Sequence, residues 1–301
     1  MPSRGILDRL NAGETLLMDG ATGSELQRRG VDVSKGATKG TLGAWSATAN
    51  LDAPDMVRAV HESYFTVGAD MVISNSFWTN RPKLAMIGED GRWEEYTRAA
   101  GDLAVDARDA ANPEAYVAGG IAPPRMGDLR KEFEDQARVL AGAGVDLMLA
   151  EYVGSIEDSV ISVEACVTVG LPVFLGLCHL STDGLMQHGE TFTDLAKALR
   201  GRRVDAVLLM CSSPEAISAS LPSLRDAFDG AVGVYANIGY GTNPRFGESA
   251  DELWHVLRED YTPERYAEFA AEWKEMGARI IGGCCGTTPA HIESIRPVVK
   301  G

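Results

Sequence analysis

The sequence is poor in positive charge. Its 301 residues include 28 Lys and Arg against 43 Asp and Glu, which gives a formal net charge of -15. Nucleic-acid binding depends on Lys and Arg side chains that neutralise phosphates, and no basic run of five or more residues is present. We therefore exclude a nucleic-acid partner.

Long apolar runs are also missing. No stretch reaches the roughly 18 apolar residues that a transmembrane helix needs, and the N-terminal segment MPSRGILDRLNAGETLLMDG lacks the apolar centre of a signal peptide. The five cysteines are an odd number in a chain without an export signal, which favours a metal site or a reactive thiol over a disulfide framework. These features predict a cytoplasmic globular enzyme without a membrane partner, either a monomer or a small homo-oligomer.

Eight short apolar runs alternate with segments of helical periodicity. The runs are 15–20, 69–76, 116–123, 146–152, 172–179, 206–211, 231–238 and 278–285. The helical segments are 54–67, 93–110, 128–143, 156–169, 192–199, 214–228, 263–276 and 289–298. The runs are apolar on both alternating faces, as in strands of a parallel sheet that is covered on both sides. The pattern predicts an α/β fold, a (β/α)8 TIM barrel, as a single domain over residues 1–301.

Polar and thiol side chains stand at the ends of these predicted strands. An open doubly wound sheet is the rival architecture, but no G-x-G-x-x-G phosphate turn follows Asp19. In a barrel, catalytic residues gather at the carboxyl ends of the strands. The strand-end candidates are Asp19, Asn75, Glu151, Cys211, Asn237, Cys284 and Cys285.

Three of the cysteines form a candidate zinc site. Cys211 ends the sixth run, and Cys284 and Cys285 end the eighth. Three thiolates with one open position are typical of catalytic Zn²⁺. Neighbouring residues of a strand point to opposite faces, so we expect the flanking glycines to let both sulfurs converge. The alternative is that they are small buried apolar residues, which is how we interpret Cys166, while Cys178 stays open.

Sequence motifs extend over nearly the whole chain. They are MDGATGSELQRRG at 18–30, WSA at 45–47, GADMVISNSF at 68–77, AEY at 150–152, CSSPE at 211–215, YANIG at 235–239 and GGCCGTTPAHI at 282–292. Together these motifs resemble the homocysteine S-methyltransferase family, which includes betaine-dependent and S-methylmethionine-dependent enzymes. The final motif is the most specific of the set.

The resemblance implies a zinc-bearing barrel in which the three cysteines hold the metal. It also implies that Asp19 and Glu151 bind the ammonium group of homocysteine, and that amides near Gly20 and Ala21 bind its carboxylate. From strand position alone, both acids could instead be strand-end caps or solvated carboxylates. Asn237, at the end of the seventh run, is a further candidate for substrate binding.

Two positions depart from the family pattern. Met210 stands where members usually carry asparagine, and the segment GGIAPP at 119–124 differs from the usual end of the third strand. Both leave the zinc ligands intact. No cobalamin-binding module is recognisable, so methylfolate is the least expected donor.

The expected reaction is methylation of the homocysteine sulfur, giving methionine. A thiol coordinated to zinc is deprotonated, and it would attack the methyl group of a cationic sulfonium or ammonium donor. S-methylmethionine, S-adenosylmethionine, betaine and dimethylsulfoniopropionate are the candidates. The indole faces of Trp45 and Trp78 could bind such a cation, although both could equally be packing aromatics.

Two other functions stay open from the sequence. One is a thiol redox protein that uses the Cys284–Cys285 pair without zinc. The other is a regulator that binds zinc and homocysteine but has lost catalysis. Zinc content tests the first alternative, and methionine formation tests the second.

Overall fold

Eight parallel strands form one sheet in this computed structural model, which describes residues 2–38, 42–124, 126–239 and 260–301. The strands are β1 (Leu16–Leu17), β2 (Met71–Ile73), β3 (Tyr116–Ile121), β4 (Leu147–Val153), β5 (Val173–Leu177), β6 (Ala206–Met210), β7 (Ala231–Ala236) and β8 (Ile280–Gly283). All eight predicted runs contain a strand. β1, β2 and β8 are much shorter than their runs. Pairing continues beyond β1 through the Met18–Met71 bridge and the Asp19 amide, which donates to the Met71 carbonyl.

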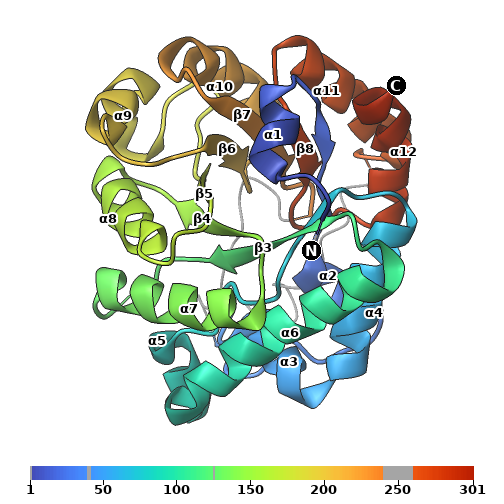
Figure 1. The fold of residues 1–301 in the computed structure, drawn as a ribbon, viewed down its shortest axis with the longest axis vertical. Helices are drawn as coiled ribbons and strands as arrows, with labels where there is room; N and C mark the ends of the chain where they lie inside the picture. The colour runs from blue at the N-terminus through green and yellow to red at the C-terminus, as the bar shows by residue number, and fades with distance from the viewer. Residues whose placement is uncertain (1, 39–41, 125, 240–259) are drawn as a thin grey trace.

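The sheet curls into a barrel. Its order is β1-β8-β7-β6-β5-β4-β3-β2, and a parallel bridge between Met18 and Met71 joins the first strand to the second. Helices surround the strands (Figure 1). The predicted (β/α)8 barrel is therefore confirmed, and its carboxyl ends lie on one side of the molecule.

Eight helices match the predicted helical segments to within two residues at each end. They are α4 (Pro54–Thr66), α6 (Trp93–Ala111), α7 (Leu129–Ala143), α8 (Ile156–Val167), α9 (Phe192–Leu199), α10 (Pro214–Ala227), α11 (Pro263–Glu275) and α12 (Pro289–Lys300). In α7 the Asp128 side chain accepts from the Lys131 amide at the start, and Gly144 ends the helix at φ 90. Such N-cap acids and left-handed glycines are ordinary helix boundaries.

Several short helices lie outside the prediction. They are α1 (Ile6–Asn11), α2 (Thr22–Arg28), α3 (Ala49–Asp52), α5 (Arg81–Leu84) and the 3₁₀ turns Trp45–Thr48, Ala85–Ile87, Asp90–Arg92 and Gln187–Gly189. Within the described ranges, no helix combines the length and apolar character needed to cross a membrane.

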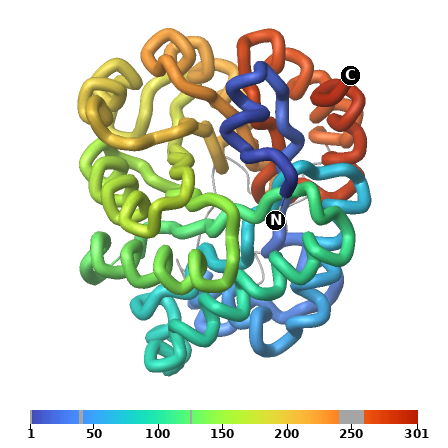
Figure 2. Tube along the Cα trace, in the orientation of Figure 1, coloured from blue at the N-terminus to red at the C-terminus, as the bar shows by residue number. Residues whose placement is uncertain are grey.

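Two apolar layers hold the barrel together. One fills the space between the sheet and the helices, and the other fills the barrel interior. Ile6 and Leu10 of α1 belong to the interior layer, and Tyr116 at the start of β3 donates from its hydroxyl to the Arg4 carbonyl. The N-terminal segment therefore closes the amino end of the barrel, where the blue tube crosses the strands in Figure 2. The carboxyl end is left for the site.

Candidate metal centre and substrate pocket

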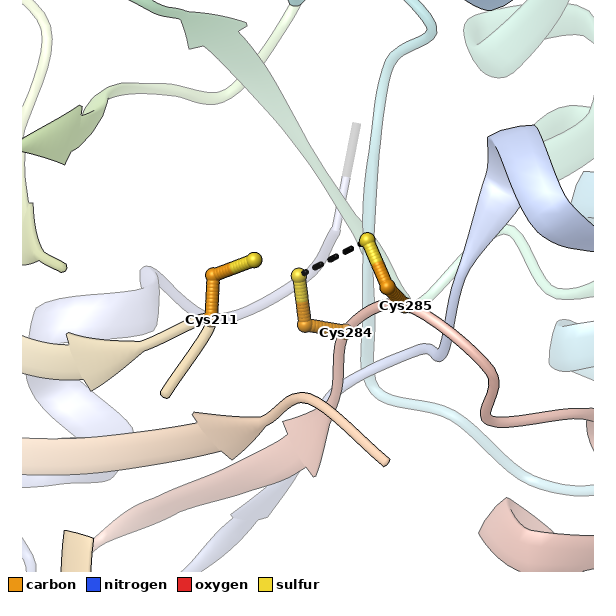
Figure 3. Close-up of side chains that lie close together, drawn as sticks. All are labelled: Cys211, Cys284 and Cys285. Carbon is orange, nitrogen blue, oxygen red and sulfur yellow. Dashed lines mark hydrogen bonds between the residues drawn. The ribbon is translucent and has the colours of Figure 1, made fainter. Parts of the chain in front are cut away.

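The three predicted cysteines meet at the carboxyl end of the barrel. Cys211 directly follows β6, and Cys284 and Cys285 directly follow β8. Their Sγ atoms all lie within 4.8 Å of one another, with 3.9 Å between those of Cys284 and Cys285 (Figure 3). Among the described residues this is the only group of three side chains placed to hold a metal ion.

Local backbone geometry brings the sulfurs together. Cys211 has a positive φ of 45, a strained conformation for a residue with a side chain and one that gathers at functional sites. Gly286 turns the chain after the vicinal pair at φ 83. Gly282, in contrast, is a strand residue whose added Cβ would stand 2.7 Å from the Asp19 carbonyl. The flanking glycines thus provide a turn at 286 and room for close packing at 282.

The cysteine group fits a zinc ion. A tetrahedral ion with Zn–S bonds of about 2.3 Å separates its sulfurs by about 3.8 Å, which is close to the spacing of the vicinal pair. Hydrogen bonding with Cys284 and Cys285, together with burial, raises the pKa of Cys211 well above its usual range. Hydrogen bonding from Cys211 and Cys284 lowers the pKa of Cys285. A cation bound among the three sulfurs would favour their thiolate forms.

The other two cysteines lie outside this group. Cys166 is buried in α8, where burial raises its pKa to about 12. Cys178 follows β5 and packs in the barrel interior, and burial raises its pKa as well. Neither thiol is readily ionised, so both are packing residues in the described structure.

Two buried carboxyl groups accompany the cysteines. Asp19 is fully buried; its Oδ2 accepts from the Ile73 amide at 2.9 Å, and its Oδ1 has no hydrogen-bond partner among the described residues. Glu151 is 4% exposed. Burial raises the pKa of Asp19 well above its usual range and that of Glu151 to about 8, and the charge of Cys284 adds to both shifts. A cationic ligand would satisfy the unpaired oxygen and favour the charged form of both acids.

Glycines in neighbouring strands make room for Glu151. A Cβ at Gly120 would stand 2.5 Å from Glu151 Oε1, and a Cβ at Gly176 would stand 2.5 Å from the Tyr235 hydroxyl. That hydroxyl donates to Glu151 Oε2 at 3.4 Å and lies 3.0 Å from Met210 Sδ. Met210, the departure from the family pattern, therefore contacts the same Tyr235 hydroxyl as Glu151. Sequence reasoning missed Tyr235, although it stands two residues before the strand-end Asn237.

Gly20 and Ala21 form the turn between β1 and α2. Tyr64 donates from its hydroxyl to the Ala21 carbonyl at 2.8 Å. The Ala21 amide donates to Thr287 Oγ1 at 3.1 Å, so binding a substrate carboxylate there would require this amide to be shared. Sequence reasoning missed both Tyr64 and Thr287. Thr287 could have been found from its position in the final motif, whereas Tyr64 lies in none of the motifs.

Asn237 lies beside a candidate metal ligand. Its Nδ2 is 3.7 Å from Cys211 Sγ, and its Oδ1 accepts from the Gly239 amide at 2.9 Å. This contact fixes the side chain toward the sulfur. Its predicted role in substrate binding stays a prediction, and its observed contact is with the cysteine.

The two tryptophans are both nearly buried. Trp45 has a positive φ of 51 and begins the 3₁₀ turn Trp45–Thr48, and its indole packs where a side chain at Gly23 would stand. Trp78 is 6% exposed, and Lys83 Nζ lies 3.5 Å from its ring centroid. One face of Trp78 therefore already holds a cation from this chain. Phe77 joins Trp78 to Tyr152, at ring distances of 5.1 and 5.4 Å.

Comparison with known proteins identifies the family. The sequence profile described as "Homocysteine S-methyltransferase" matches residues 16–299. The chain belongs to the homocysteine S-methyltransferase family. It is accordingly an enzyme that transfers a methyl group to homocysteine, as the resemblance implied.

The relatives match over almost all of this homocysteine S-methyltransferase. Homocysteine S-methyltransferase 1 of Zea mays is 26% identical, with 99% of this chain and 98% of the relative covered. S-methylmethionine--homocysteine S-methyltransferase BHMT2 of Mus musculus is 29% identical, with 97% and 80% covered. The crystal structure of the oxidized form of the Escherichia coli homocysteine methyltransferase MmuM superposes with a TM-score of 0.76 at 25% identity, covering 99% of both chains. Its metallated form gives a TM-score of 0.77 at 24% identity and covers 97% of this chain.

Proposed function

We propose that this methyltransferase binds one Zn²⁺ through Cys211, Cys284 and Cys285 and methylates homocysteine at that ion. The observation that carries the proposal is the convergence of three sulfurs within 4.8 Å from two separate strand ends. The metallated form of the Escherichia coli relative supports a metal in this family, and sulfur-rich tetrahedral coordination favours zinc.

Asp19 and Glu151 are proposed to hold the substrate ammonium group. Both are buried carboxyl groups, and the charge of Cys284 acts on each of them, so they lie near the cysteines. An ammonium group placed between them would supply the partner that Asp19 Oδ1 lacks. The two acids would therefore orient the thiol end of homocysteine toward the cysteines, which lowers the entropy cost of the reaction.

The rest of the chemistry follows from the site's charges. Cys211, Cys284 and Cys285 would hold the zinc ion, which would supply the acidity that keeps a bound substrate thiol deprotonated. Asn237 contacts Cys211 Sγ, and such a contact orients a metal ligand. The transfer itself would need no general base from the chain, because the substrate sulfur would be bound as a thiolate.

The methyl donor is proposed to be a small sulfonium or ammonium compound, with S-methylmethionine first and betaine second. The names of the rodent relatives include S-methylmethionine or betaine as donor, and S-adenosylmethionine stays in the proposed class. Trp45 and the Trp78 face opposite Lys83 are the proposed contacts, since an indole attracts an onium cation. The neutral product loses this attraction and can leave.

One assay tests the proposed function. Zinc-loaded protein is incubated with homocysteine and, separately, each of S-methylmethionine, betaine, S-adenosylmethionine, dimethylsulfoniopropionate and methylfolate, and methionine is measured. We expect about one zinc per chain and methionine with a cationic donor. Zinc without methionine from any donor would indicate the non-catalytic regulator, and the absence of zinc binding would indicate the redox alternative. Methionine with methylfolate alone would overturn the donor class.

A further inference from the structure

The Thr287 hydroxyl bonds both of the turns that carry the candidate site residues. Thr287 lies between β8 and α12 and is 1% exposed. Its Oγ1 donates to the Cys284 carbonyl at 2.6 Å and accepts from the Ala21 amide at 3.1 Å. The same atom therefore bonds both the turn that carries the cysteine pair and the turn that follows Asp19.

The contacts around this hydroxyl make the junction close. The Gly283 amide donates to the Asp19 carbonyl at 2.9 Å, and a Cβ at Gly20 would stand 2.8 Å from Thr287 Oγ1. The Tyr64 hydroxyl also reaches both turns, at 2.8 Å from the Ala21 carbonyl oxygen and 3.4 Å from the Thr287 carbonyl oxygen. Thr287 thus contributes to the spacing between the two turns, and its buried hydroxyl uses both its donor and its acceptor.

That spacing matters because homocysteine has two ends. On the proposed function, its thiol is bound at the cysteines and its ammonium group at Asp19 and Glu151. A ligand with two anchoring points binds well only when the distance between its ends matches the distance between the two sites. The distance between the two turns therefore determines which length of ligand can reach both sites.

We propose that Thr287 is a positioning residue that holds the amino-acid half of the pocket in register with the thiol half, and so selects homocysteine by chain length. The inference rests on the proposed function. Thr287 touches neither end of the substrate in this scheme; it acts through Ala21 and Cys284. Thiols that are anchored only at the metal should be indifferent to it.

The test compares two-ended and one-ended thiols. Thr287→Val keeps the shape of the side chain and removes the hydroxyl. Calorimetric titration of the zinc-loaded proteins with homocysteine, with 2-amino-5-mercaptopentanoate (one methylene longer) and with propanethiol gives three Kd values. We expect Thr287→Val to raise the homocysteine Kd about three- to tenfold, the range of one lost hydrogen bond. Selectivity over the longer thiol should fall, while the propanethiol Kd and zinc per chain stay unchanged.

Two matched variants complete the design. Thr287→Ser keeps the hydroxyl and should restore the homocysteine Kd. Thr288→Val makes the same change at the next residue, whose hydroxyl lies 3.0 Å from His291 Nδ1, and should leave the ratio of the Kd values as it is. If Thr287→Val does not fold, Thr287→Ala replaces it in the same titrations.

Three results would contradict the inference. Equal loss of affinity for homocysteine and propanethiol, or loss of zinc, would mean that Thr287 only supports the metal-binding turn. An unchanged homocysteine Kd would mean that the hydroxyl sets no register. Wild-type protein that binds no homocysteine would overturn the proposed function and this inference with it, and that result is obtained before any substitution is made.

Discussion

The carboxyl groups at the two ends of the barrel have different partners. At the amino end, an aspartate precedes each of β2, β4 and β6 and accepts from the amide of a residue in the preceding odd-numbered strand, at 2.8–2.9 Å. Each of these aspartates also pairs with at least one basic side chain. The pairs are Asp70 with Leu17, Arg9 and Lys300; Asp146 with Val117 and Arg108; and Asp205 with Val173 and Arg203.

At the carboxyl end, Asp19 and Glu151 are buried, and neither forms an ion pair with a basic side chain among the described residues. Asp19 and Glu151 have raised pKa values because they are desolvated. Three residues that end or follow strands there, Tyr152, His179 and Cys211, have positive φ angles. One end of the barrel therefore stabilises the fold with paired charges, while the other combines desolvated carboxyl groups with strained backbone, a combination that gathers at functional sites.

The cysteines should show the largest effect at the carboxyl end. Replacing Cys284 or Cys285 singly with alanine should lower zinc from about one per chain and abolish methionine formation, because two sulfurs do not complete the site. Cys166→Ala should keep both zinc and activity. Metal analysis and the methionine assay check the prediction, and full zinc retention in both variants would contradict the ligand assignment.

Glu151→Gln should weaken homocysteine binding about ten- to a hundredfold, since a charged hydrogen bond contributes roughly 1.5–3 kcal/mol. Zinc should be retained. A thiol without the amino group should be nearly indifferent, and kinetics with the two thiols measure this. An equal loss of affinity for both thiols would mean that Glu151 supports the fold and does not bind the ammonium group.

The same substitution should stabilise the fold at high pH. The pKa of Glu151 is raised from 4.5 to about 8 in the folded protein, so the folded state holds its proton more tightly than the unfolded state. Its contribution to stability is present below pH 4.5 and is lost as the pH rises toward 8. The advantage of Glu151→Gln over wild type in thermal unfolding should therefore grow from pH 5 to pH 8, and a constant difference would contradict the account.

The matched change at the amino end should act in the opposite sense. Asp146→Asn removes the charge that pairs with Arg108, whose side chain is 4% exposed. We expect a loss of about 2 kcal/mol in the free energy of unfolding, because the buried Arg108 loses one of its two carboxylate partners and keeps only Asp109. The homocysteine KM should not change. Denaturant unfolding and kinetics check both parts. A raised homocysteine KM in a variant whose unfolding free energy equals that of wild type would contradict the separate roles of the two barrel ends.

The smallest expected effect is at Trp78. Trp78→Ala should raise the donor KM several-fold at saturating homocysteine, since a cation–π contact contributes about 0.5–2 kcal/mol. Homocysteine affinity should hardly change. An unchanged donor KM in both Trp78→Ala and Trp45→Ala would remove the cation–π argument.

Sequence patterns predicted the barrel well because strands buried on both faces leave short runs that are apolar at every position. The cysteine group was predicted because three thiols at the ends of two such runs suit a metal site better than packing. Helices of four to seven residues, such as α2 and α5, were missed because they are too short to show a period. The contact between Lys83 and the Trp78 ring was missed because lysine side chains are mostly exposed.

The partners of the site residues were harder to predict than the site residues themselves. Tyr235 and Met210 continue apolar strands and read as core, yet the Tyr235 hydroxyl contacts both Met210 Sδ and Glu151. Thr287 reads as a turn residue, and its bond to Ala21 joins positions 266 residues apart. Contacts at such separation arise only from closure of the barrel, which no local pattern contains.

Removing and restoring the metal tests the central claim most directly. The protein is stripped of zinc with a chelator under reducing conditions and assayed for methionine with homocysteine and S-methylmethionine or betaine, before and after stoichiometric Zn²⁺ is added back. The account predicts that methionine formation is lost on stripping and returns at about one zinc per chain. Full activity in the zinc-free protein would contradict it.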